Sequence, residues 1–287
     1  MRENIRFVVV MAAILAVGLI GYRLLFPPDA AMPLLVQAVE GTVRSVDRDG
    51  ARAAVTPGLM LGRSDRIETA ADGRAFLSMG EGSTLTLDHG SAIQVLSVTR
   101  DGVRVELDGG AVEATVRPER GRVGVVHAGR EVSSGDGSFA VGVNPAGNLA
   151  VEAHVGEVAV EGLESVQALQ EGERLMLLAD GSSQVASIPE SLLLEVAWPQ
   201  SAQTRYAEVA VRGLTDPGAE VRLGASGHWT TVTADASGHF EANIPLLEGE
   251  NPVRVVSQDP LGHSVEASHT IVRDSEPPGG STIEVQY

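Results

Sequence analysis

Between residues 40 and 186, apolar and polar residues alternate with a period of two along one short segment after another. Successive side chains of a β-strand point to opposite faces, so this alternation is the pattern of strands with one buried face. It is clearest at 85–87, 103–107, 112–116 and 149–160. Since no long stretch here has the 3.6-residue period of an amphipathic helix, the sequence predicts an all-β domain over residues 40–188.

Asp-Gly steps separate many of these segments. They occur at 49–50, 72–73, 101–102, 108–109, 136–137 and 180–181. Both residue types tolerate the positive φ of tight turns, so each step is expected to mark a turn between strands. Phe76 and Phe139 fall inside the strand patterns, and we expect both in the core.

The turn and strand motifs of this region resemble the FecR domain. The resemblance rests on "VEGTVRSV", on "GLMLGRSDRIETAADGRAFLSMGEGSTLTLDHGSAI" and on "VRVELDGGAVEATV", and it extends from Gly41 to Glu173. Ser64-Asp65 stands where the family pattern has Gly-Asp, and Gly137-Ser138 where it has Gly-Thr. These motifs describe turns rather than chemistry. The resemblance therefore implies an extracytoplasmic, β-rich and solenoid-like domain, and it says little about mechanism.

A second β region is predicted over residues 189–274. The segment "VAVRGLTDPGAEVRL" places the turn Asp216-Pro217-Gly218 between two alternating stretches. Roughly seven short strands with frequent turn signals are typical of an immunoglobulin-like (Ig-like) sandwich. The pattern from Val211 to Gly262 also resembles bacterial Ig-like domains, which implies a spacer or adhesion module. Residues 275–287, rich at first in Pro and Gly, are expected to form a C-terminal tail.

An apolar run near the N-terminus predicts a membrane anchor. Residues 7–26 are interrupted only by Arg23, which is close enough to the end of the run to reach the lipid headgroups. About 20 residues in a helix cross a bilayer core, and Pro27-Pro28 would end that helix. We therefore expect a transmembrane helix over 7–26, followed by a linker over 27–39.

The flanks of this run indicate its orientation. Arg2 and Arg6 place the cytoplasmic side at residues 1–6 by the positive-inside rule. Pro28 and Asp29 disfavour a signal-peptidase site at the end of the run, so an uncleaved signal-anchor is expected over a cleaved signal peptide. This topology puts the protein in the inner (cytoplasmic) membrane, with its C-terminal domains in the periplasm or outside the cell.

The charge and composition exclude several kinds of partner and site. The formal net charge is −17, all 21 basic residues are arginine, and there is no cysteine. An acidic surface of this kind repels nucleic acid, so no nucleic-acid partner is expected. Disulfides, thiolate metal sites and cysteine nucleophiles are excluded.

No catalytic, cofactor or metal site is predicted. The sequence lacks the G-x-S-x-G, H-E-x-x-H and phosphate-loop motifs. Four of the seven histidines lie in the second β region, but no pair has the helical spacing of a zinc site. Ligation across strands stays open as an alternative. We therefore expect a protein that is not an enzyme and carries no cofactor.

Two sets of residues are candidates for ligand contact. Arg117, Arg120 and Arg122 cluster in "RPERGRVG" and could meet an anion, although a solvated loop in a very acidic protein is the favoured interpretation. Trp229 follows a turn and is the best single candidate for an exposed contact, with a half-buried sandwich tryptophan as the alternative.

These features predict a non-enzymatic, membrane-anchored envelope protein whose extracytoplasmic β domains act as a binding or scaffolding arm. Its expected partners are the membrane and an envelope protein or the cell wall. Six residues cannot fold into an effector domain. A sensory or regulatory role would therefore require a separate membrane partner, and we keep it as the alternative. A hydrolase accessory module would need a catalytic domain, which this sequence does not show.

Overall fold

The computed structural model describes residues 34–276, except residues 48, 81, 119–120 and 200. This part of the chain contains 25 strands and no helix, which confirms the all-β class. Within it, no helix is long and apolar enough to span a membrane. The predicted anchor at 7–26, the segment 1–6 and most of the tail 275–287 lie outside the described residues.

The N-terminal unit is built from seventeen strands. They are β1 (Leu34–Glu40), β2 (Val43–Val46), β3 (Arg52–Ala54), β4 (Met60–Leu61), β5 (Arg66–Thr69), β6 (Arg74–Met79), β7 (Ser83–Leu87), β8 (Ala92–Thr99), β9 (Gly102–Val116), β10 (Arg122–His127), β11 (Arg130–Ser134), β12 (Gly137–Val143), β13 (Leu149–Val155), β14 (Val158–Glu161), β15 (Ala168–Leu169), β16 (Glu173–Leu177) and β17 (Ser183–Ser187).

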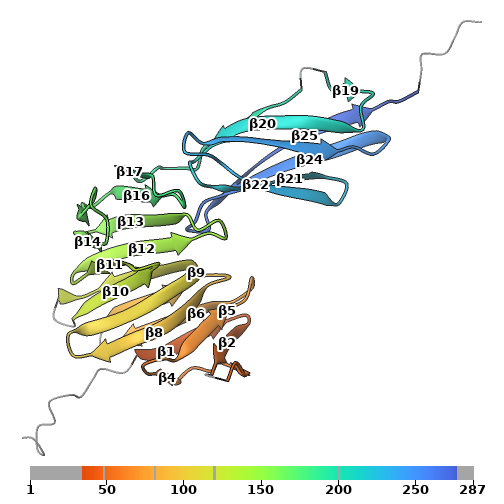
Figure 1. The fold of residues 1–287 in the computed structure, drawn as a ribbon. Coiled ribbons are helices and arrows are strands. Elements are labelled where there is room, and N and C mark those ends of the chain that lie inside the picture. The colour runs from red at the N-terminus through yellow and green to blue at the C-terminus, as the bar shows by residue number, and fades with distance from the viewer. Residues whose placement is uncertain (1–33, 48, 81, 119–120, 200, 277–287) are drawn as a thin grey trace, which may run out of the picture.

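These strands form two sheets around one core. Sheet A has the order β4-β1-β6-β7-β9-β12-β13-β16-β17. Sheet B has the order β3-β2-β5-β8-β9-β10-β11-β14-β15. Strands are added in nearly sequential order along one axis, from β1 at one end to β17 at the other (Figure 1). Strands β9 and β10 pair in parallel, and the other strand pairs described in the unit are antiparallel. The unit is therefore elongated along one axis, as a solenoid is, but most of its neighbouring strands pair as in hairpins.

Strand β9 belongs to both sheets. It pairs with β8 and β10 in sheet B as far as Gly109, and with β7 and β12 in sheet A from Gly110 onward. Gly110 has a φ of +81°, and a Cβ atom there would lie 2.5 Å from the Cα atom of Ser91. The Asp108-Gly109 step was predicted as a turn, and this prediction is wrong. Gly110 bends one continuous strand from sheet to sheet instead of closing a hairpin.

A sharp turn precedes β5, and its backbone conformation explains one family motif. The Asp65 carboxylate accepts a hydrogen bond from the Gly62 N–H at 2.8 Å. Ser64 has a φ of +74°, the left-handed conformation that costs a residue with a side chain roughly 1–2 kcal/mol. The FecR pattern has glycine at this position. Ser64 therefore carries backbone strain that glycine would avoid, but the turn is kept.

The core of the N-terminal unit lies between sheets A and B and follows the predicted alternation. Phe139 is fully buried in it, as predicted. The prediction for Phe76 is wrong, because it alternates with the buried Ala75 and Leu77 and therefore lies half-buried on the outer face of sheet A.

The start of the unit also differs from the predicted linker at 27–39. Strand β1 begins at Leu34 and pairs with β6, because Leu34 and Val36 alternate as buried residues ahead of the expected boundary. The FecR-like motifs begin only at Gly41, so sequence resemblance did not reach this strand.

The C-terminal unit is a two-sheet arrangement with its own core. Its strands are β18 (Leu194–Ala197), β19 (Gln203–Thr204), β20 (Glu208–Thr215), β21 (Glu220–Ala225), β22 (His228–Thr233), β23 (His239–Pro245), β24 (Gly249–Gln258) and β25 (Ser264–Arg273). Sheet C has the order β18-β20-β23 and sheet D the order β19-β25-β24-β21-β22. Alternate residues of both sheets meet in the core, among them Val211, Leu223 and Val255.

Candidate functional site

The N-terminal and C-terminal units contact each other through buried, hydrogen-bonded side chains. One side is the outer face of sheet A, where β12, β13 and β16 lie side by side. The other side is the turn Asp259–His263 between β24 and β25, together with the turn Asp216–Gly218 between β20 and β21. We call this contact the junction.

An apolar contact forms the centre of the junction. Leu261 is 5% exposed and packs with Ala150 and Met176, which face outward from sheet A. Gly142 of β12 permits this approach, because a Cβ atom there would lie 2.2 Å from the Pro260 carbonyl oxygen. Small residues on sheet A thus let a turn of the C-terminal unit reach the sheet surface.

A buried arginine joins the two units beside this contact. The Arg174 guanidinium donates from Nη2 to Asp259 Oδ2 at 2.9 Å, and its Nη1 lies 3.6 Å from Glu152 Oε1. All three side chains are at least 93% buried. Buried charges are tolerated only when they are paired, so each carboxylate depends on this arginine.

Two asparagines hold the second turn. Asn144 and Asn148 flank the turn between β12 and β13, and both donate to the Gly218 carbonyl oxygen, at 2.8 and 2.9 Å. The Asn148 side-chain oxygen accepts from the Ala179 N–H at 2.9 Å. Because both side chains are buried and hydrogen-bonded, the turn from the C-terminal unit has a defined position on sheet A.

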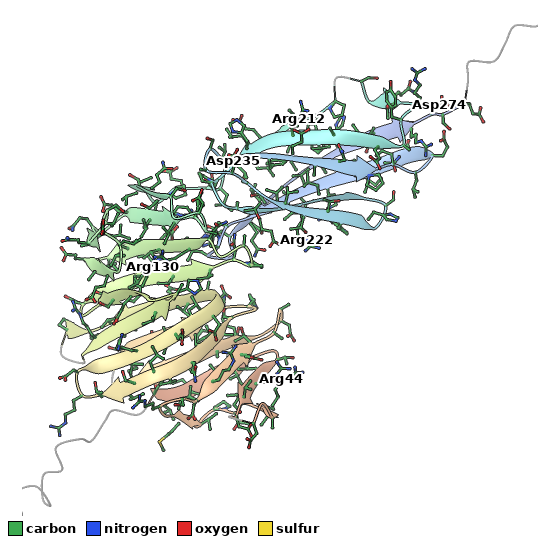
Figure 2. All side chains as sticks on the ribbon, in the orientation of Figure 1. Arg44, Arg130, Arg212, Arg222, Asp235 and Asp274 are labelled. Carbon is green, nitrogen blue, oxygen red and sulfur yellow. The ribbon has the colours of Figure 1, made fainter. Side chains whose placement is uncertain are left out.

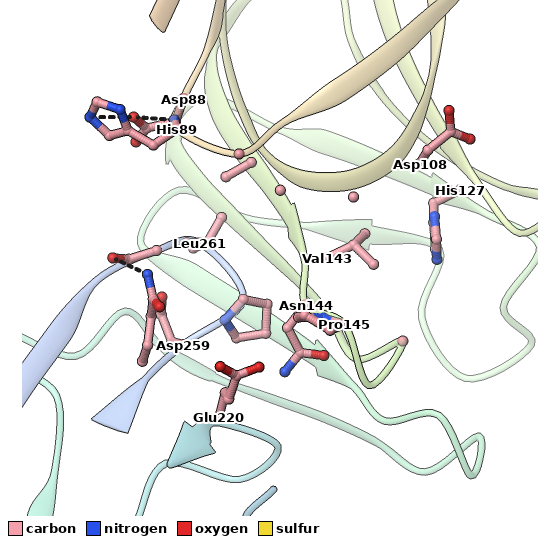
Figure 3. Close-up of a pocket in the computed structure, with 18 residues that line it drawn as sticks. Asp88, His89, Asp108, His127, Val143, Asn144, Pro145, Glu220, Asp259 and Leu261 are labelled. Carbon is pink, nitrogen blue, oxygen red and sulfur yellow. Dashed lines mark hydrogen bonds and ion pairs between the residues drawn. The ribbon is translucent and has the colours of Figure 1, made fainter. Parts of the chain in front are cut away.

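A cavity of about 510 Å³ opens beside the junction (Figure 3). Asp88, His89, Asp108 and His127 line it from the N-terminal unit, whereas Glu220 and Asp259 line it from the C-terminal unit. Three of these four carboxylates are already in ion pairs: Asp88 with Arg74, Asp108 with Arg66 and Asp259 with Arg174. The cavity therefore carries several ionisable side chains on its walls, and most of its acidic groups are neutralised within the protein.

Burial and ion pairing act in opposite directions on two carboxyls near the junction. Burial alone would raise the pKa of Asp88, but the His89 N–H and Arg74 outweigh it and leave that pKa lowered. Burial raises the pKa of Asp216, the Asp259 carboxylate adds to this, and Arg174 and the Leu193 N–H only partly oppose it. The Asp216 Oδ2 atom is buried and has no hydrogen-bond partner among the described residues. The surroundings of Asp216 at the junction therefore disfavour the charged form of its carboxyl group.

We expect Asp216→Asn to raise the melting temperature at pH 7. A folded-state pKa above the unfolded value of roughly 3.9 means that the folded chain binds the proton more tightly. Stability is then lost as pH rises through the raised pKa, and removing the charge restores it. Near pH 3, where the carboxyl is mostly protonated in both states, the variant should melt like the wild type. Thermal unfolding between pH 3 and pH 8 measures this difference.

Asp235→Asn in the same unit serves as the control of opposite sign. Hydrogen bonds from the His239 and Ser237 N–H groups lower the pKa of Asp235. Its charge therefore favours folding at pH 7, and its removal should not stabilise the chain. A wild-type pH profile for Asp216→Asn would contradict the prediction.

The structure separates the residues predicted for ligand contact. Trp229 lies on β22, at the edge of sheet D, and is 44% exposed. Arg117 follows the end of β9 in sheet A and lies against Gly82, whereas Arg122 begins β10 in sheet B. Arg120 lies outside the described residues. Both described arginines are exposed, and their role in anion binding stays a prediction.

Among the described residues, no group of three or more His, Asp or Glu side chains is arranged to hold a metal ion. His263 instead contacts the Asp259 carboxylate at 3.2 Å, and His127 Nδ1 lies 2.8 Å from the Leu107 carbonyl oxygen. His263 therefore belongs to the junction, and His127 contacts β9 just before its bend.

The sequence motifs did not single out Arg174, Asn144, Asn148 or Leu261. One signal for the junction was present: in "NLAVEA" and "ERLMLL" the outward-facing positions Ala150 and Met176 are apolar as well, so apolar residues run consecutively through the alternating pattern. Consecutive apolar residues are typical of strands that are covered on both faces.

A match to a known family covers the larger part of the N-terminal unit. The model of the family described as "FecR protein" matches residues 65–182. The chain contains a FecR domain. The match begins at the turn before β5 and ends just before β17, so the two sheets of the unit extend beyond the matched FecR region at both ends.

Two kinds of protein are among the solved structures with some similarity to the chain. Two crystal structures of a proposed anti-sigma factor from Parabacteroides distasonis ATCC 8503 share 23% and 22% identity, each with a TM-score of 0.38. Each comparison covers 42% of this chain and 59% of that one, which is less than two thirds of its length. A tetra-tandem repeat from the extending region of a large adhesion protein shares 15% identity over 84% of this chain and 68% of that chain, with a TM-score of 0.26. A comparison with curated proteins finds no match.

Proposed function

We propose that the chain is a non-enzymatic, membrane-anchored envelope protein. In this proposal the FecR-containing unit and the C-terminal unit, an Ig-like domain at about residues 189–274, form one stiff binding or scaffolding arm. The single observation that carries the proposal is the junction. Neighbouring domains usually move relative to each other unless their contact is large and well packed.

The junction supports an arm because it restricts several directions of movement at once. Arg174 and Asp259 join the units by a buried ion pair, and Asn144 and Asn148 bind Gly218 through two hydrogen bonds. Leu261 fills the apolar centre between these contacts. A hinge between independently moving domains would instead be expected to have few buried contacts and a solvated linker.

The N-terminal end of the arm is proposed to face the inner membrane, with both β units on the periplasmic or extracellular side. The predicted anchor at 7–26 leads into β1, which pairs with β4 through Leu35 and Met60. Leu59 and Met60 are exposed there, and Met60 is 66% exposed. Backbone hydrogen bonds to Val36 fix this loop beside β1. An apolar loop at the point where an anchor enters suits a position close to lipid.

Cysteine labelling in spheroplasts tests the proposed location, because the chain has no cysteine of its own. Leu247→Cys places one thiol at a position that is 54% exposed in the C-terminal unit. We expect a membrane-impermeant maleimide to label it in intact spheroplasts, and the labelled chain to sediment with the membranes. Ala225→Cys, at a site only 3% exposed, should react only after unfolding. Labelling of Leu247→Cys only after lysis would contradict the proposal.

A sensory or regulatory role is the second candidate, and the FecR family match favours it. In this role, the arm would report an extracytoplasmic event through a separate membrane partner. Deleting the gene should then alter transcription of a defined set of genes, and only the full-length chain should restore it. An unchanged transcript profile would leave the scaffolding role as the better account.

A further inference from the structure

An exposed tryptophan is the most unusual feature of the outer face of sheet D. Trp229 is 44% exposed and pairs with Gly224 on the neighbouring strand β21. A Cβ atom on Gly224 would lie 2.9 Å from the indole atoms Cδ2 and Cε3 of Trp229. The indole therefore lies directly over the glycine. The missing side chain leaves space for a large ring on an otherwise polar strand surface.

Two arginines from neighbouring strands accompany this ring. The guanidinium carbon of Arg222 is 5.3 Å from the indole centroid, and that of Arg254 is 6.0 Å away. Arg254 also binds Glu266 through two hydrogen bonds, at 2.7 and 2.5 Å, which fix its orientation. Arg222, in contrast, has no carboxylate within ion-pair distance among the described residues. Figure 2 shows Arg222 on the side of the C-terminal unit opposite to Arg212.

Trp229, Arg222 and Arg254 form what we call the Trp229 platform. From its chemistry we infer that the platform binds a sugar ring that carries a carboxylate. The indole can pack against the apolar C–H face of a pyranose, as aromatic side chains do with apolar partners. A guanidinium recognises a carboxylate with two parallel hydrogen bonds, and Arg222 is the arginine with that capacity to spare.

The acidity of the whole chain narrows the ligand class further. With a net charge of −17, the protein repels densely charged polyanions. Charges beyond about 8 Å are largely screened at physiological salt, so the local arginines dominate for a single carboxylate. The platform therefore suits a glycan in which acidic sugars alternate with neutral ones, and it disfavours nucleic acid and heavily sulfated chains.

The position of the platform agrees with such a ligand. Trp229 lies on the C-terminal unit, which extends away from β1 and the N-terminal end of the arm (Figure 1). Access to envelope glycans rests on the proposed extracytoplasmic location. Binding in solution does not depend on that location. A negative binding experiment would therefore overturn this inference alone, and a negative labelling experiment would overturn the proposed location alone.

Titration of the full-length chain in detergent with two oligosaccharides tests the inference. The acidic probe is a hyaluronan hexasaccharide, in which glucuronate alternates with N-acetylglucosamine. The neutral probe is hexa-N-acetylchitohexaose, which consists of N-acetylglucosamine alone. We expect the acidic probe to bind at least about fivefold more tightly, and Trp229→Ala to weaken its binding about tenfold or more, as for a central aromatic contact. Calorimetry measures both affinities.

Three variants separate recognition from folding. Arg222→Gln should remove the preference for the acidic probe while retaining binding of the neutral one, and Trp229→Phe should retain part of the affinity for both. Tyr206→Ala removes another exposed aromatic residue beside an arginine, Arg205, and should change nothing. Melting curves check that each variant folds. The inference is overturned if neither probe binds, if the acidic probe has no advantage, or if folded Trp229→Ala binds like the wild type.

Discussion

Arg174→Met is expected to open the junction between the two units. The substitution keeps an unbranched side chain of similar length but removes the arginine that contacts both Glu152 and Asp259. Breaking one partner of a buried ion pair costs about 3–5 kcal/mol, because a charge is left without compensation. Here the two carboxylates can regain water if the units separate. The expected result is therefore loss of the defined junction before loss of either fold.

The distance between two spin labels measures this opening. Thr99→Cys and Ser268→Cys place one label on each unit at exposed positions, in a chain that has no other cysteine. The wild-type junction should give a narrow distance distribution and Arg174→Met a broad one. Thermal unfolding should change from a coupled transition to two separate ones, since the units no longer stabilise each other.

Two further variants sharpen the Arg174 test. Arg212→Met removes an arginine from a surface pair with Glu241, in which the side chains are 67% and 54% exposed, and should leave both the distance distribution and the melting temperature nearly unchanged. Combining Arg174→Met with Glu152→Gln and Asp259→Asn removes all three charges and should restore part of the narrow distribution. A narrow distribution in the Arg174→Met single variant would show that the ion pair does not hold the units together.

The sequence predicts the strands of this protein far better than it predicts how the two units meet. Alternation identifies strands because one buried face imposes a period of two on each of them, as Leu85 and Leu87 of β7 illustrate. It fails at Asp108-Gly109, a turn motif that lies inside β9. The left-handed residue here is the next one, Gly110, and it bends the strand from one sheet to the other instead of closing a hairpin. Local propensity cannot distinguish these two uses of glycine.

The junction was harder to predict because its contacts join distant parts of the chain. Arg174 and Asp259 are 85 positions apart, and nothing in either local sequence indicates the other. Leu261 lies in a turn, where one apolar residue has no periodic signal. Trp229 was accessible to prediction, since its exposure follows from its position after a turn and on the outer side of a strand. What the sequence could not show was the pair of arginines beside it.

The junction also depends on the absence of a side chain, which leads to a second prediction. Gly142→Ala is expected to separate the units while leaving the FecR-containing unit folded. Gly142 lies in β12, where alanine is compatible with the backbone, and its φ is not in the left-handed region. A Cβ atom there would lie 2.2 Å from the Pro260 carbonyl oxygen and 2.8 Å from the Leu261 Cα atom. The added methyl therefore acts as a wedge against the backbone of the C-terminal unit, and Leu261 must leave its contact.

The same spin-label distance reports on this wedge, and Gly109→Ala provides the matched control. Gly109 also lies in a strand without a left-handed φ, but a Cβ atom there would have no neighbour within 4 Å. It should retain the narrow distance distribution, whereas Gly142→Ala should broaden it as Arg174→Met does. Overpacking of this kind typically costs about 1–3 kcal/mol, so the melting transition of the C-terminal unit should fall as it loses its contact with sheet A. Because a methyl group carries no charge, a wild-type distance in Gly142→Ala would show that the turn at Pro260 yields, and that close packing is not what holds the arm stiff.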